Sequence, residues 1–289
     1  MDSPHCLHAR KAVKPGKPAS TDPILSLVHA MSGKSGVDRL LVGGLLLGLW
    51  WWAAAVVGSY WISSPLETVQ RLWALVATGG LLRHTGYTLA AAALGFTLGG
   101  VPGVWLPMAL RKWPFLQEVL DPFLTAGYGL PKLALAPLFI LWFGIGMASK
   151  VVLAASVVFF IVFFSTQAGV RQADQRLVRM ARVLGARESQ VARKVVWPAV
   201  VPYVFAGFRI ATPYAIGGVI ISELVSSNRG LGYLVQYGAM SYSTPDIFAT
   251  VAAITVLIGV ATWLVGRLEQ RLLRWRPETT GLRSGGVAP

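Results

Sequence analysis

The stretch VVLAASVVFFIVFFSTQAGV, residues 151–170, contains no Asp, Glu, Lys or Arg. A helix needs about 20 predominantly apolar residues to cross the hydrocarbon core of a bilayer, and this stretch meets that length. Five further runs contain at most one charged residue each: residues 40–66, 86–110, 122–149, 195–222 and 247–266. They lack the short alternating pattern of transmembrane β-strands. The sequence therefore predicts an all-α, polytopic membrane protein with about six transmembrane helices.

The composition agrees with a chain that lies largely in lipid. Hydrophobic residues make up 54% of it and charged residues only 13%. Soluble domains carry about 25% charged residues, so the deficit indicates a surface that does not face water.

The excess of basic residues follows the expected membrane topology. The chain carries 26 Lys and Arg against 12 Asp and Glu, a formal net charge of +14. With the N-terminus inside, 20 of the 26 fall in residues 1–39, 111–121, 171–194 and 267–289. The outer loops hold the other four that lie outside the apolar runs: Arg71, Arg83, Lys150 and Arg229. This asymmetry is the positive-inside rule, which places both termini in the cytoplasm and explains the charge without nucleic acid as a partner.

The domain organisation follows from these runs. Residues 1–36 are polar, lack an apolar period, and are expected to form a mobile cytoplasmic tail. Residues 37–66 are expected to form the first span, 67–276 the core domain, and 277–289 a second cytoplasmic tail. The only cysteine is Cys6, and the four histidines are scattered, so the sequence predicts neither an internal disulfide nor a metal site.

Two of the apolar runs are rich in glycine or proline, which affects how their helices pack and whether they are continuous. Residues 86–110 contain five glycines that predict close helix packing: Gly86, Gly95, Gly99, Gly100 and Gly103. The run 122–149 contains Pro122, Pro131 and Pro137, with Gly127 and Gly129. Two interpretations stay open for it: a broken helix at a transport site, or a simple kink.

Two cations lie inside the apolar runs, Lys132 and Arg209. An ionisable residue within a span is a functional hypothesis by default. Arg209 could contact a substrate, extend toward the cytoplasm, pair with a carboxylate or hold a dimer together, and Lys132 is similarly ambiguous. Glu223 lies about 21 Å further along a straight helix and is not expected to pair with Arg209.

The loop between the fourth and fifth runs, residues 171–194, predicts a helical hairpin. Leu177, Met180, Ala181 and Leu184 recur at i, i+3, i+4 and i+7, which is one face of a helix. Gly185 follows directly, and a second helical pattern begins a few residues later. An apolar ridge on such a hairpin would face the cytoplasm and needs a partner.

This loop resembles the EAA loop of bacterial ATP-binding-cassette (ABC) importer permeases. The resemblance rests on MARVLG, residues 180–185, followed after nine residues by VVWP, residues 195–198. Trp197 stands where the family usually has Leu, and Arg179 stands at the position of the family's acidic residue. Residues 135–146, 203–211 and 230–234 resemble the nitrate, sulfonate and taurine branch, and the similarity covers roughly residues 66–276.

The resemblance implies a type I ABC importer permease fold in a bacterial inner membrane. The implied complex has two permease chains, expected to be a homodimer, two ATPase subunits, and a periplasmic or lipid-anchored solute-binding protein. The implied substrate is a small anion: an alkanesulfonate, taurine or nitrate. ATP and Mg would be used by the partner ATPase, since this chain has no P-loop and is expected to bind no cofactor.

The resemblance also implies roles for particular residues. The ATPase-coupling residues are Ala181, Leu184, Gly185, Ala186, Val195, Trp197 and Pro198. Independently of the resemblance, the cations within the spans and the helix-breaking prolines give the substrate-path candidates: Pro131, Lys132, Pro137 and Arg209. No catalytic residue is expected.

Two other classes fit the sequence less well. A membrane-embedded enzyme needs clustered acids, histidines or nucleophiles, whereas the loops offer only Asp174, Glu188 and scattered residues. A secondary transporter would favour intramembrane carboxylates and two similar halves, and neither is evident.

Overall fold

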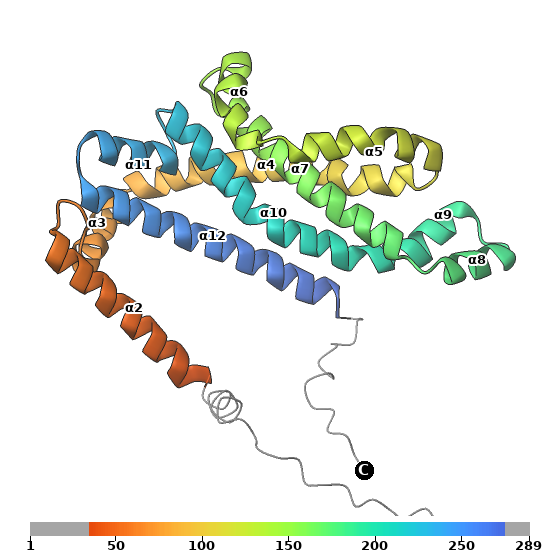
Figure 1. Cartoon of the computed structure of the whole chain (residues 1–289), viewed down its shortest axis with the longest axis horizontal. Helices are drawn as coiled ribbons and strands as arrows, with labels where there is room; N and C mark the ends of the chain where they lie inside the picture. Colours follow the sequence, from red (N-terminus) through yellow and green to blue (C-terminus); the bar gives the residue numbers. More distant parts are fainter. Residues whose placement is uncertain (1–34, 275–289) are drawn as a thin grey trace, which may run out of the picture. The chain divides into compact units, whose positions relative to one another are not determined.

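The computed structural model describes residues 35–274, which form helices and no strand (Figure 1). Cys6, nearly all of the predicted N-terminal tail and the whole tail 277–289 lie outside the described residues. The chain divides into two parts, residues 1–52 and residues 53–289. Five helices are long and apolar enough to cross a membrane, or up to six if a bent pair counts as one span. The predicted all-α fold with about six spans is confirmed.

The first helix is shorter than the predicted span 37–66. Helix α2 covers Ser35–Val57 and ends because Gly58 adopts a positive φ of 91°. The next helix, α3 (Pro65–Ala77), begins with a capping box in which the Ser64 side chain accepts from the Glu67 N–H and Glu67 accepts from the Ser64 N–H. Residues 58–64 therefore form a connection between two helices.

Three long helices form the core of the second part: α4 (Gly80–Leu110), α7 (Met147–Gln172) and α10 (Trp197–Val225). Helix α7 packs against both of the others. A Cβ atom added at Gly95 would lie 2.9 Å from the Val151 carbonyl oxygen, and one at Gly99 would lie 2.9 Å from the Phe159 nitrogen. Gly103 continues this stripe. The predicted close packing is confirmed at Gly95, Gly99 and Gly103, because only glycine allows the α7 backbone this near, whereas an added Cβ atom at Gly86 would meet nothing within 4 Å.

The run 122–149 is a broken helix rather than a simple kink. Helix α5 (Pro114–Gly129) is followed by the 3-10 turn η1 (Lys132–Leu135) and by α6 (Ala136–Phe143), with a bend of 76° between the two limbs. Pro131 has no N–H to continue the helix, and Leu130 before it is extended, with ψ at 136°.

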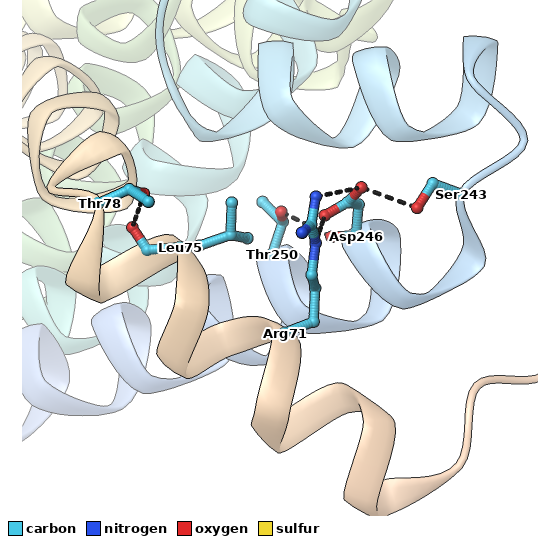
Figure 2. Close-up of polar contacts among 6 residues, drawn as sticks. All are labelled: Arg71, Leu75, Thr78, Ser243, Asp246 and Thr250. Carbon is cyan, nitrogen blue, oxygen red and sulfur yellow. Dashed lines mark hydrogen bonds and ion pairs between the residues drawn. The ribbon is translucent and has the colours of Figure 1, made fainter.

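Helices α11 (Leu231–Met240) and α12 (Thr244–Leu272) complete the second part. Figure 2 shows how α3 is fixed to α12: the Arg71 guanidinium binds the Asp246 carboxylate, which also accepts from Ser243 Oγ at 2.7 Å. A short hairpin of α8 (Gln175–Val183) and α9 (Glu188–Val191) leads through the π-helical turn η2 (Ala192–Val196) into α10. In Figure 1 the hairpin and α11 lie at opposite ends of this part.

We expect Gly99→Val to destabilise the folded permease by about 1–3 kcal/mol, the usual cost of overpacking a tight core. The readout is the apparent melting temperature of the purified protein in detergent. Gly86→Val is the matched control, since Gly86 lies on the same helix and an added Cβ there would meet nothing within 4 Å. Equal melting temperatures for the two variants would show that the α4–α7 contact does not depend on Gly99.

Candidate functional site

Helix α8 presents one face to the protein and one to solvent. The Asp174 side chain begins the helix by accepting from the Arg176 N–H at 2.7 Å. Val178 is buried, whereas Leu177, Met180 and Leu184 are 54%, 63% and 80% exposed. We call these three exposed side chains the apolar ridge. The ridge matches the predicted one except at Ala181, which packs against the core instead.

The turn after α8 has the hydrogen bonds of a Schellman motif. Gly185 N donates to Arg182 O at 2.9 Å, and Ala186 N donates to Ala181 O at 3.0 Å. Gly185 has a φ of +80°, which a side chain disfavours, yet a Cβ atom there would meet nothing within 4 Å. The open space on this side means that the turn conformation, rather than a neighbour within the chain, requires glycine.

The predicted coupling residues do not form a single surface. Ala181, Ala186 and Val195 are partly buried and pack against the core cluster that runs up into α7 and α10. Trp197 and Pro198 line an apolar groove of about 820 Å³ between α4 and α10. Only Leu184 and Gly185 lie at the exposed tip of the hairpin.

A carboxylate that the sequence analysis did not assign holds the hairpin to the bundle. Glu188, at the start of α9, accepts from Arg111 at the end of α4 and from Arg182 Nη2 of α8 at 3.0 Å. Helix α8, α9 and α4 therefore meet at one side chain. Because buried Val191 and Val196 continue the same core into α10, the hairpin is built as an extension of that helix.

Lys132 lies at the break between α5 and η1. Its Nζ donates to the carbonyl oxygens of Tyr128 at 2.8 Å and Leu130 at 3.4 Å, and it lies 4.4 Å from the Phe160 ring centroid. A cleft of about 620 Å³ opens here between α5, α7 and α10. Its walls are mostly aromatic and aliphatic: Tyr128, Leu130, Pro131, Lys132, Leu133, Val157, Phe160, Ile161, Phe164, Ser165, Ile210 and Tyr214. We call it the Lys132 cleft.

The remaining substrate-path candidates lie elsewhere. Arg209 Nη2 donates to Glu269 Oε2 at 2.7 Å and so joins α10 to α12, which is the carboxylate pairing left open by the sequence. Pro137 is exposed in the first turn of α6 and does not line the Lys132 cleft. Of the four candidates, the structure brings Lys132 and Pro131 together and leaves the other two apart.

The end of α10 far from the hairpin carries a buried polar network that sequence reasoning missed. Glu223 is fully buried, and its carboxylate accepts from Thr88 Oγ1 of α4 at 2.9 Å and from Gly232 N of α11 at 2.8 Å. Lys150 of α7 is also fully buried and within electrostatic range of Glu223. We call these residues the Glu223 network; its hydrogen bonds tie α4, α10 and α11 together.

These features define a polytopic helical membrane protein with a helical hairpin that carries an exposed apolar ridge at one end, and a largely apolar cleft that contains one lysine at a broken span. Residues 95–274 match the family of binding-protein-dependent transport system inner membrane components, and the chain belongs to this family. It is a permease subunit of an ABC importer, a multi-pass membrane protein and not an enzyme.

Relatives and a solved structure agree with this assignment. The chain is 34% identical to the riboflavin transport system permease protein RibX of Chloroflexus aurantiacus, over 80% of this chain and 87% of that one. It is 32% identical to the putative aliphatic sulfonates transport permease protein SsuC of Bacillus subtilis, over 84% and 88%. Its fold resembles the inward-facing MetNI methionine ABC transporter, with a TM-score of 0.54 and 20% identity over 70% of this chain and 96% of that chain.

We expect Glu223→Ala to destabilise the protein by about 1–3 kcal/mol, because it leaves the buried Gly232 N–H without an acceptor and removes the acceptor that Thr88 Oγ1 shares with α10. The apparent melting temperature in detergent measures this loss. Glu118→Ala removes an exposed carboxylate from α5 and serves as the control. If both alanine variants have the melting temperature of the wild type, the Glu223 network does not stabilise the packing of the helices.

Proposed function

We propose that this permease forms, with a second copy, the membrane path for an aliphatic sulfonate delivered by an external solute-binding protein. Two partner ATPases, which bind ATP and Mg, drive transport from the cytoplasmic side, where both termini also lie. The observation that carries this proposal is the hairpin, whose ridge is exposed and whose base is part of α10.

The hairpin geometry supports mechanical coupling. Leu177, Met180 and Leu184 offer an apolar surface to a partner, and an exposed apolar patch of this kind marks an interaction site. The inner face of the hairpin is packed into the core and bonded through Glu188. A partner that moves the ridge would therefore move α10, which extends about 39 Å from Trp197 to Glu223.

The Lys132 cleft supports an anionic substrate with an apolar body. An ammonium has three N–H donors, and the Tyr128 and Leu130 carbonyls accept from two of them. The remaining donor and the positive charge suit a sulfonate oxygen, and the aromatic walls suit an alkyl chain. SsuC of Bacillus subtilis, named for aliphatic sulfonates, agrees with this class.

A second candidate substrate is a heteroaromatic solute. The walls of the Lys132 cleft include Tyr128, Phe160, Phe164 and Tyr214, rings on which a planar ligand can stack. RibX of Chloroflexus aurantiacus is named for riboflavin.

A binding screen separates the two candidates. The cognate solute-binding protein is melted in the presence of butanesulfonate, taurine, nitrate and riboflavin, and bound ligand raises its melting temperature. We expect a rise with butanesulfonate or taurine, and uptake of the same compound by proteoliposomes that contain the whole complex. Stabilisation by riboflavin alone would contradict the sulfonate proposal and favour the heteroaromatic one.

A pair of substitutions tests the coupling role of Gly185. We expect Gly185→Val to abolish uptake while the protein stays in the membrane, because a β-branched residue cannot hold φ at +80° without strain. Gly185→Asn tolerates that φ, yet it places a side chain in the open space where the ATPase would dock. Uptake by proteoliposomes and co-purification of the ATPase are the readouts.

The two variants distinguish two roles of Gly185: holding the turn conformation and allowing the ATPase to approach closely. Loss of uptake in both shows that the ATPase needs close approach at Gly185, whereas loss in the Val variant alone shows that only the turn conformation matters. Normal uptake by the Val variant would remove Gly185 from the coupling mechanism.

A further inference from the structure

A small basic pocket lies at the end of the bundle far from the hairpin. It has a volume of about 200 Å³ and is lined by Arg83, His84 and Tyr87 of α4 and by Asn228 and Arg229 of the loop that leads into α11. These residues belong neither to the hairpin nor to the Lys132 cleft. We call it the Arg83–Arg229 pocket.

The cations at this end differ in what they bind. Arg71 is paired with Asp246. Lys150 donates to the carbonyl oxygens of Ile145 and Gly146 at 3.0 Å each and is buried near Glu223. Within residues 35–274, Arg83 and Arg229 have no acidic partner, and both are exposed. Two exposed arginines without an acidic partner around one concave site concentrate positive charge there, and such a site favours an anionic ligand.

The pocket is held in shape before any ligand arrives. Gly230 N donates to His84 Nδ1 at 2.9 Å, and Ser227 Oγ donates to Arg229 O at 2.6 Å. The His84 ring stacks on Tyr233 of α11 at a centroid distance of 5.7 Å and an interplanar angle of 18°. Leu231 N donates to Thr88 Oγ1 at 2.9 Å, which joins the loop to the Glu223 network. Such preorganisation lowers the entropic cost of binding.

The surface beside the pocket has the composition of a protein interface. Tyr237 lies 6.1 Å from Tyr233 between ring centroids and is 57% exposed, and Met240 and Tyr242 further along are 74% and 78% exposed. Tyr, Met and Arg are enriched in protein–protein interfaces. This combination favours a protein ligand over a free anion.

We infer that the Arg83–Arg229 pocket binds a carboxylate side chain of the solute-binding protein and fixes how that protein docks on α11. This inference rests on the proposed function, which supplies a binding protein on this side of the membrane. Two guanidinium groups can bind one carboxylate through several charge-assisted hydrogen bonds. Paired charges of this kind mainly accelerate association and set orientation.

Binding kinetics test the inference on the complete complex in nanodiscs. We expect the Arg83→Gln/Arg229→Gln double variant to slow association of the solute-binding protein on the order of tenfold at low salt and to flatten its salt dependence. Lys112→Gln is the control: it changes an exposed cation just after the other end of α4 and should change neither. ATP hydrolysis without binding protein should stay at the wild-type rate in both, which shows intact assembly.

A chemical cross-link identifies the ligand. A carbodiimide activates a carboxylate, and a lysine amine then attacks the activated acyl group to form an amide while the carbodiimide leaves as a urea; the protonated guanidinium of arginine does not react. Arg229→Lys should therefore form an amide with an Asp or Glu of the solute-binding protein, located by mass spectrometry. Cross-linking to no acidic residue, together with unchanged association of the double variant, would overturn the inference. If the double variant slows association only in nanodiscs that contain anionic lipid, the pocket binds a lipid headgroup. That result would also overturn the inference.

The wild-type complex separates this inference from the proposed function. If the solute-binding protein associates with the wild-type complex and the arginine substitutions do not change this association, only the role of the Arg83–Arg229 pocket is rejected. Failure of any solute-binding protein to associate with the wild-type complex rejects both.

Discussion

The contact on which the rest of this structure depends is the glycine stripe of α4 against the backbone of α7. Lipid supplies no hydrophobic force between helices, so van der Waals packing has to hold them together. Gly95, Gly99 and Gly103 bring the two backbones close enough for that packing. Gly169 and Gly207 do the same between α7 and α10, where they lie against Tyr203 and Ser165. These three helices pack with little space between their backbones, and such close packing favours movement as one body.

Polar side chains then fasten the two ends of this body. Glu188 joins the hairpin to α4 at one end, and Glu223 joins α11 to α4 and α10 at the other. Since the core cluster runs without a gap from α10 to Val178 of α8, a force on the ridge is carried by packed side chains. The broken span at Pro131 is packed less closely than these three helices. Its two limbs differ in direction by 76°, and the Lys132 cleft opens beside the break.

The sequence predicts the parts of this structure that depend on local pattern. Uncharged runs identified the spans, and the helix–glycine–helix pattern identified the hairpin and its turn at Gly185. The pairing of Arg209 with Glu269 stayed one alternative among four, because the two residues lie 60 positions apart. For Glu223 the sequence predicts only that it lies too far from Arg209 to pair with it, since its actual partner Thr88 is 135 positions away. Polar groups that pair across helices leave no periodic signal, so the Glu223 network and the Arg83–Arg229 pocket required coordinates.

The central claim is that the hairpin, α4 and α10 move together when the ATPases act. A double variant, Arg111→Cys/Glu188→Cys in a Cys6→Ser background, removes the ion pair that joins the hairpin to α4. A short bismaleimide can then restore a covalent connection at the same place in the assembled complex. If the hairpin and α4 form one body, uptake per ATP hydrolysed falls in the untreated variant and recovers after cross-linking. If cross-linking instead stops uptake that the untreated variant still supports, the hairpin has to move relative to α4, and the claim is wrong.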